Sequence, residues 1–132
     1  MKEIKSVEEY NQASHDIIGA AIEVHKYLGP GLLETVYEEC LASELTQRGY
    51  RVERQVNRPI IYKDKPVGHP LKIDLLVEGC IIVELKAVDQ MLEIYTAQLL
   101  TYLKLAGMKL GLLINFNTIQ LRDGIKRVVN DL

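Results

Sequence analysis

Two apolar, β-branched runs that carry three charged side chains constrain this chain more than any other feature. Residues 73–77 and 81–85 are typical of buried strands, yet Asp74, Glu84 and Lys86 lie in or directly beside them. Burying an unpaired charge is costly, so such side chains are normally ion-paired, bound to a metal ion or used in function. Two carboxylates and one lysine also form the charge set of a divalent-cation site.

The turn between the two runs decides which side chains share a face. Glu78-Gly79 is typical of a tight β-hairpin, and successive side chains of a strand point to opposite faces. An even loop would separate Asp74 from Glu84, whereas a three-residue loop, Glu78-Gly79-Cys80, sets them opposite each other. We therefore predict the three-residue loop. One face then carries Asp74, Leu76, Ile82, Glu84 and Lys86, and the other carries Ile73, Leu75, Val77, Ile81, Val83 and Leu85.

A purely structural explanation of the three charges is open at this point. Lys86 could neutralise Asp74 or Glu84 in a salt bridge at the rim of the sheet. Such a pair would need neither a metal ion nor a substrate. The spacing of the residues does not decide between this salt bridge and a metal site.

Several motifs together resemble a known group of nucleases. Asp74 followed by Glu84-Leu85-Lys86 resembles the split signature of the PD-(D/E)XK, or restriction-endonuclease-like, superfamily, although Ile73 stands where a proline often precedes the aspartate. The segment from Gly31 to Tyr37 is similar to the motif that names the GxxExxY family. The resemblance runs from about residue 17 to the C-terminus and implies an α/β fold with a mixed central sheet flanked by helices. Further matches are Glu23-Val24-His25, Leu28-Gly29-Pro30-Gly31, residues 98–103 and residues 111–116.

The chemistry of phosphodiester hydrolysis assigns roles to the strand residues. Asp74 and Glu84 would coordinate Mg²⁺ or Mn²⁺, with the main-chain carbonyl of Leu85 as a further oxygen ligand. Lys86 would orient the attacking water or stabilise the developing negative charge. The expected substrate is nucleic acid, DNA rather than RNA.

Four helical residues are further candidates, each with a structural alternative. Glu34 is predicted to point inward as an additional metal-binding and catalytic carboxylate, or it only favours the positive end of a helix dipole. Tyr37 would bind substrate, or it packs in the core with its hydroxyl bonded. Gln98, one turn before Tyr102, would orient a carboxylate or phosphate, or it bonds a backbone group. Tyr102 would contact substrate.

Charge is distributed unevenly although the formal net charge is only −2. Residues 1–47 carry three basic and nine acidic side chains, whereas residues 48–72 carry seven basic and two acidic ones. This basic stretch leads directly to Asp74, so it is either a phosphate-binding track or a solvated face. The candidate phosphate ligands within it are Arg51, Arg54, Arg58 and Lys72.

Hydrophobic periodicity predicts one domain over residues 1–132. Helices are expected at 7–27, 32–48 and 91–106, and strands at 51–55, 59–62, in the Asp74/Glu84 hairpin and at 110–115, with edge strands at 119–121 and 126–129. No apolar run is long enough to span a membrane, and we expect a cytoplasmic protein without membrane attachment. Two distant cysteines indicate neither a zinc site nor a disulfide framework.

Three functions remain open. The first is a metal-dependent nuclease, in which a homodimer could set two basic stretches side by side. The second is a catalytically idle or partner-dependent nucleic-acid-binding module with the same fold. The third is an interaction scaffold whose charged triad is only a salt-bridge network.

Overall fold

A five-stranded mixed sheet forms the centre of residues 3–132, which are the residues that this computed structural model describes. The elements are α1 (Val7–Leu28), α2 (Glu34–Gln47), β1 (Val52–Arg58), β2 (Ile61–Tyr62), β3 (Lys65–Pro66), β4 (Leu71–Val77), β5 (Ile81–Lys86), α3 (Glu93–Ala106), β6 (Leu110–Asn115), η1 (Leu121–Gly124) and β7 (Ile125–Val129). The strand order is β1-β4-β5-β6-β7, and only β5 and β6 run parallel. The predicted α/β class, a mixed central sheet flanked by helices, is confirmed.

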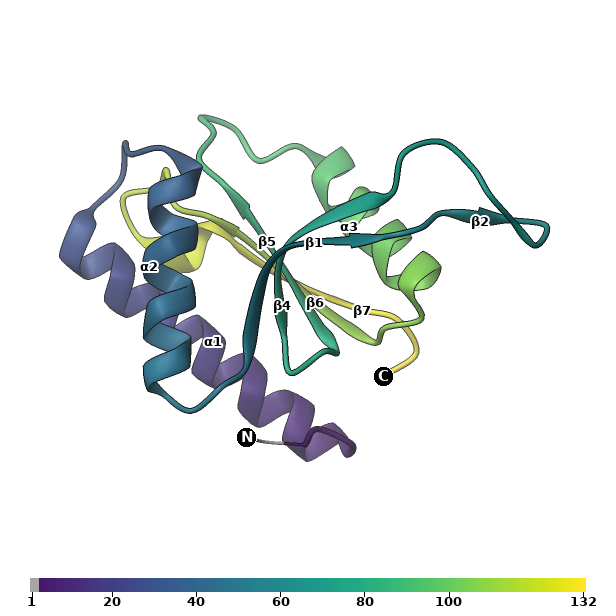
Figure 1. Cartoon of the computed structure of the whole chain (residues 1–132). Helices are drawn as coiled ribbons and strands as arrows, with labels where there is room; N and C mark the ends of the chain where they lie inside the picture. Colours follow the sequence, from purple (N-terminus) through teal and green to yellow (C-terminus); the bar gives the residue numbers. More distant parts are fainter. Residues whose placement is uncertain (1–2) are drawn as a thin grey trace.

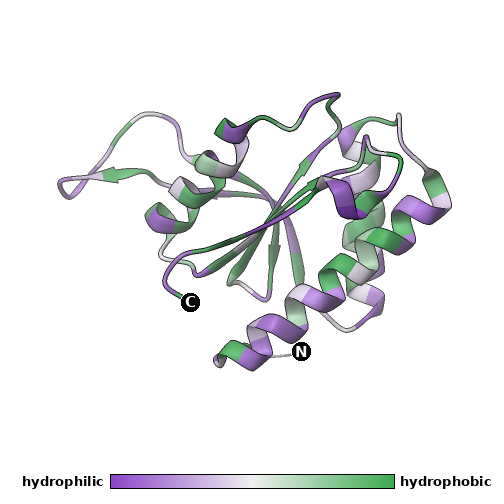
Figure 2. Cartoon of the chain, turned by 180° about the vertical axis from the view of Figure 1, so that it is seen from behind, coloured by the Kyte–Doolittle hydropathy of each residue, from purple (hydrophilic) through white to green (hydrophobic). Residues whose placement is uncertain are grey.

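Helices cover both faces of the sheet. Figure 1 shows α1 and α2 on one face and α3 on the other, with the connection from β5 to the parallel strand β6 passing through α3. The first face packs an apolar cluster that includes Leu75, Val83 and Leu112, and the second packs one that includes Leu76, Ile82 and Leu99. In Figure 2 the central strands are correspondingly hydrophobic. The chain therefore has two apolar layers separated by the sheet.

Helix α1 has one apolar side and one charged side. Ser6 caps its N-terminus by accepting a hydrogen bond from the Glu9 N–H, and the Glu9 side chain bonds back in a capping box. Ile17, Ala21 and Val24 are buried against the sheet at helical spacing. Among the helices of residues 3–132, none has a stretch long and apolar enough to cross a membrane.

Most of the predicted elements are found, with two differences at the edges. The short strand expected at 119–121 is wrong, because Ile119 is exposed in a turn and residues 121–124 form a 3₁₀ helix. His25 from α1 contacts the Thr118 carbonyl oxygen at 2.8 Å, which holds this segment across the end of the sheet. Strand β1 also continues to Arg58, beyond the expected end at residue 55.

The outer part of the β1/β4 pair continues as an arm, here defined as residues 57–72, which includes the β2–β3 hairpin. Figure 1 shows the arm extending from the sheet past α3. At its base Gln55 has a left-handed backbone (φ 51°) within β1 and lies opposite Asp74 on β4, next to the Val56–Ile73 pair. Ile73 packs with Leu76 rather than with Leu75, so its predicted face is wrong. The bend at Gln55 interrupts the simple alternation of faces.

Candidate metal and active site

Strands β4 and β5 separate where the two carboxylates meet. The β4–β5 pairing joins Val77 to Ile81 and Leu75 to Val83, so the loop has three residues and the same register sets Asp74 opposite Glu84. This prediction is confirmed. At that level the carboxylates bond to main-chain N–H groups: the Leu85 N–H donates to Asp74 Oδ2 at 2.9 Å, and the Asp74 N–H donates to Glu84 Oε1 at 3.4 Å. The two side chains therefore fill a fork between the strands.

Electrostatics at the fork favour a proton or a cation. Burial, followed by the negative charge of Asp74, raises the pKa of Glu84 from 4.5 to about 9, and the nearby Lys86 only partly offsets this. Glu84 therefore holds a proton at neutral pH when no cation is bound. Two facing carboxylates with one displaceable proton are well suited to a divalent ion, because the ion removes the repulsion between them.

A further oxygen donor faces the fork. The Phe116 N–H donates to the Lys86 carbonyl oxygen at 2.9 Å, so the peptide groups of Lys86 face β6. Because these groups alternate along a strand, those of Leu85 face β4, as the Leu85–Asp74 hydrogen bond also indicates. Two carboxylates and a carbonyl fit Mg²⁺ or Mn²⁺, with open positions for water and phosphate.

Lys86 is not part of a salt bridge. None of the ion pairs within residues 3–132 involves it, and its Nζ instead lies 4.4 Å from the centroid of the Tyr95 ring on α3. The aromatic face can hold an ammonium group without neutralising its charge. The structural salt bridge that the spacing left open is therefore absent from the described part of the chain. Lys86 therefore lies beside the fork without an ion-pair partner among residues 3–132.

A chain of polar side chains connects α2 to Asp74. The Gln55 Nε2 donates to Glu38 Oε1 at 2.5 Å and to Asp74 Oδ1 at 3.3 Å. Glu38 is buried and forms an ion pair with Arg54 at 3.0 Å. Neither Glu38 nor Gln55 was predicted from the sequence. Glu38 could have been found from its place next to Tyr37 on the buried stripe, but the left-handed backbone that aims Gln55 has no evident sequence signal.

Glu34 does not point inward, so that prediction is wrong. It is exposed as the first residue of α2, and a helical side chain leans toward the N-terminus of its helix. Its carboxylate is thereby directed beyond the sheet, whereas Glu38, one turn later, reaches β1. Within residues 3–132, no group of three or more histidine, cysteine, aspartate or glutamate side chains is arranged to hold a metal ion. The fork is thus a two-carboxylate site.

Tyr37 is a core residue and does not bind substrate in this structure. It is fully buried, its ring stacks on Phe116 with centroids 4.4 Å apart, and its hydroxyl donates to the Gly29 carbonyl at 2.6 Å. The hydroxyl also accepts from the Leu32 N–H at 3.1 Å. Both bonds hold the turn between α1 and α2. The packing alternative for Tyr37 is therefore the correct one.

The two candidate residues on α3, Tyr102 and Gln98, differ in their relation to the fork. Burial, followed by the charges of Glu84 and Asp74, raises the pKa of Tyr102, so its hydroxyl lies within electrostatic range of the fork. Gln98 is exposed one turn earlier, and no hydrogen bond within residues 3–132 joins it to either carboxylate. The predicted orienting contact of Gln98 is not formed here.

The four basic candidates do not form a single track. Arg51 lies at the Glu78-Gly79 turn, where its main-chain N–H bonds the Glu78 carboxylate, at the end of the hairpin away from the fork. Arg54 is engaged by Glu38. Arg58 and Lys72 lie on adjacent rungs of the arm, beyond the fork. The track expected from the sequence is thus divided over three places along the β1/β4 pair.

Asn115 holds the backbone that follows Lys86. Its buried side chain accepts from the Val88 N–H at 3.1 Å and donates to the Val88 carbonyl at 3.0 Å. Asn115 also lies beside Lys86 in the parallel β5–β6 register. The position of the lysine therefore depends on a side chain from the neighbouring strand.

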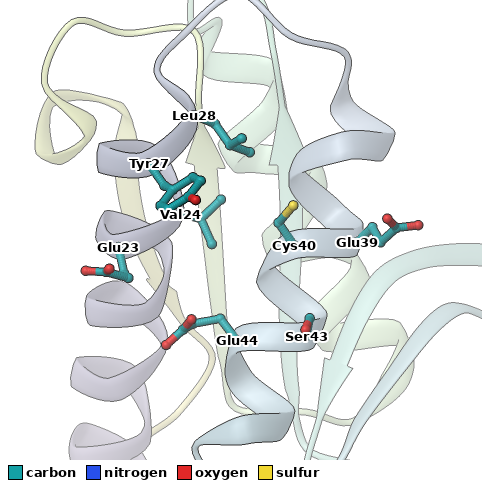
Figure 3. Close-up of a pocket in the computed structure, with 8 residues that line it drawn as sticks. All are labelled: Glu23, Val24, Tyr27, Leu28, Glu39, Cys40, Ser43 and Glu44. Carbon is teal, nitrogen blue, oxygen red and sulfur yellow. The ribbon is translucent and has the colours of Figure 1, made fainter.

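A separate hollow of about 510 Å³ lies between α1 and α2, away from the fork. Figure 3 shows Val24, Leu28 and Cys40 at its apolar centre and Glu23 and Glu44 at its rim. Its acidic character is opposite to what a phosphate ligand requires. We do not assign the phosphodiester chemistry to this hollow.

Comparison with known protein families gives a match that covers most of the chain. A family model described as the PD-(D/E)XK nuclease superfamily matches residues 11–128. The match spans the elements from α1 to β7 and includes Asp74, Glu84 and Lys86. The comparisons with curated proteins and with solved structures gave no match.

Proposed function

Because the chain belongs to the PD-(D/E)XK nuclease superfamily, we propose that it is a divalent-metal-dependent nuclease that hydrolyses phosphodiester bonds, with DNA rather than RNA as its substrate. The fork carries this proposal, since Asp74 and Glu84 face each other there and Lys86 makes no ion pair within residues 3–132. The motif from Gly31 to Tyr37 further supports placement in the GxxExxY family.

Asp74, Glu84 and the Leu85 carbonyl would hold the metal ion. Mg²⁺ or Mn²⁺ bound there would neutralise charge on the scissile phosphate and lower the pKa of a bound water. Gln55 and the Leu85 N–H orient Asp74 for this role. Glu84 must lose its proton before it can bind the ion, so metal affinity should rise with pH.

Lys86 would act on the reacting groups directly. Its ammonium, held over the Tyr95 ring, would donate a hydrogen bond to the attacking water or to a phosphate oxygen. Asn115 positions the lysine through the following backbone. The positive charge of the lysine would stabilise the negative charge that develops on the phosphate oxygens as the phosphodiester is attacked.

The arm would hold the phosphate backbone. Arg58 and Lys72 are its basic residues nearest the fork, and contacts of this kind position a substrate without reading its sequence. A homodimer would double this basic surface, and light scattering of the purified protein tests that part of the proposal.

The test is cleavage of labelled single- and double-stranded DNA and RNA in Mg²⁺ and in Mn²⁺. We expect Glu84→Ala and Lys86→Ala each to lose about a hundredfold or more in rate. Glu34→Ala and Lys104→Ala are matched controls, because both side chains are exposed on helices and neither has a role in the fork. Cleavage should stop when a chelator is added and resume when the metal is restored.

The outcome separates three functions. Cleavage that persists in Glu84→Ala would come from a contaminating nuclease and would not support the proposal. Absent cleavage with metal-sensitive binding of nucleic acid would indicate a catalytically idle or partner-dependent module. Absence of both would leave an interaction scaffold.

A further inference from the structure

A groove between α3 and the base of the arm leads toward the fork. It has a volume of about 470 Å³, within the range of about 300 to 1,000 Å³ typical of small-ligand clefts. Its apolar lining comes from both walls, with Ile94 and Leu105 on α3 and Ile60 and Leu71 on the arm side. We call this feature the α3 groove.

The α3 groove lies close to the candidate active site. Tyr102 lines it and also lies within range of the charges of Glu84 and Asp74. Leu71, on the other wall, begins the strand that carries Asp74. A chain segment lying in the groove would therefore pass the carboxylate pair.

The walls of the α3 groove are apolar, whereas the adjoining arm is basic. Ile94 and Leu105 remain 65% and 45% exposed although large apolar side chains usually gain by burial. The adjoining arm carries four basic side chains and one acidic one, whereas the chain as a whole is acidic. An apolar floor beside a basic edge suits a ligand with a flat apolar face on an anionic backbone.

Among nucleic acids, only an unpaired strand presents both of these surfaces. In a duplex the bases are stacked inside and the outer surface is phosphate and sugar, so a duplex would leave the apolar lining uncovered. An unpaired strand can place a base on apolar or aromatic side chains while basic residues bind its phosphates. Charge complementarity and closeness to the fork both favour this occupant.

We infer that the α3 groove binds unpaired bases of the DNA strand that is cut, so that the substrate is single-stranded next to the scissile phosphate. This inference rests on the proposed function and narrows its substrate class. Ile94 and Leu105 lie about three helical turns apart on α3 and would contact two different bases, and Arg58 and Lys72 would contact the flanking phosphates.

Binding by a full-length Glu84→Gln variant tests the inference without cutting the substrate. The probes are a short labelled oligothymidine and a hairpin duplex of the same length, measured by fluorescence anisotropy at one salt concentration. Ile94→Ala/Leu105→Ala in this background should weaken binding of the oligothymidine about tenfold and that of the duplex less than about twofold. Leu33→Ala/Ile119→Ala is the matched control, since both side chains are 75% or more exposed and neither lines the groove.

A second measurement varies the oligonucleotide. An oligothymidine with one abasic nucleotide, moved along the strand, should lose affinity at one or two particular positions for the control variant but at no position for the groove variant. Thermal unfolding of each variant shows whether it is folded.

Equal weakening of single strand and duplex, or of neither, would overturn the inference. Wild type that cuts duplex as fast as single strand, with no effect of the groove variant, would reject the groove while retaining the nuclease. Conversely, groove-dependent preference for the single strand without any cleavage would support the groove and reject the nuclease.

Discussion

The α1–α2 hollow and the α3 groove are similar in size and opposite in character. Their volumes are about 510 and 470 Å³, but Glu23, Glu39 and Glu44 line the first, whereas the second adjoins the basic arm. Only the α3 groove lies beside the carboxylate pair. Volume alone would therefore not identify the site, whereas charge and position relative to the fork do.

The two sides of the sheet also use their polar residues differently. On the α1–α2 side Tyr37 satisfies its hydroxyl and locks a turn, which stabilises the fold. On the α3 side Glu84 is partly buried next to another carboxylate, which destabilises the fold until a proton or a cation is bound. The α1–α2 side would stabilise the fold, whereas the facing carboxylates on the α3 side would lower its stability and serve function.

Replacing Tyr37 should have the largest destabilising effect. Tyr37→Ala removes a fully buried ring stacked on Phe116 and should lower the free energy of unfolding by about 4 kcal/mol in urea titrations. Tyr27→Ala is the control, because Tyr27 is 88% exposed and should change stability by less than about 0.5 kcal/mol. If Tyr37→Phe kept full stability but lost cleavage, the assignment of Tyr37 to the core alone would be wrong.

The sequence predicted the site's strands well because burial and alternation dictate them. The hairpin register follows from a three-residue loop and two runs with a period of two, and both are visible in the residues 73–86. The helical contribution was misplaced by one turn. Glu34 and Glu38 occupy the same helical stripe, and only the position of the sheet relative to the start of α2 distinguishes them.

Contacts between distant parts of the chain could not be predicted from the sequence for a different reason. Gln55 reaches Asp74 because its backbone is left-handed. Glutamine rarely adopts this conformation, and no neighbouring residue predicts it. The sequence showed which residues are basic, but not that Arg54 would be paired with Glu38.

Glu84 should make stability depend on pH. Its pKa in the folded protein is about 9 against an ordinary value of 4.5, so the stability of the fold is unaffected by this group below pH 4.5 and falls progressively as the pH rises from 4.5 to 9. Glu84→Gln, which has no such charge, should therefore be more stable than wild type at pH 8, by up to about 5 kcal/mol. The difference should vanish near pH 4.5.

Mn²⁺ should sharpen this test, since it would stabilise wild type at pH 8 and leave Glu84→Gln nearly unchanged. Denaturant titrations at both pH values, with and without the ion, provide the measurement. A constant difference between the two proteins at all pH values would contradict the raised pKa.

Shortening Gln55 should weaken the metal site without disturbing the core. Gln55→Asn keeps an amide and tolerates the left-handed backbone, but it is too short to connect Glu38 with Asp74. Loss of an outer hydrogen-bonding partner of this kind should weaken Mn²⁺ affinity about tenfold, measured by calorimetry. Gln98→Asn, a similar change on exposed α3, is the control. Equal affinity of Gln55→Asn and wild type would show that Asp74 needs no support from α2.

Charges on the arm should have the smallest effect, and it should depend on salt. Lys63→Ala/Lys65→Ala removes two exposed cations from the β2–β3 hairpin, and Lys5→Ala/Lys26→Ala removes two exposed cations from the α1 side, so the change in net charge is the same. If the arm binds phosphates, only the first variant should weaken oligothymidine binding, about fivefold at low salt, and flatten the slope of log affinity against log salt by about one to two. Equal effects of both variants would mean that net charge alone attracts the nucleic acid. The difference in function between the α1–α2 side and the α3 side would then rest on the fork and the α3 groove, and the arm would have no part in it.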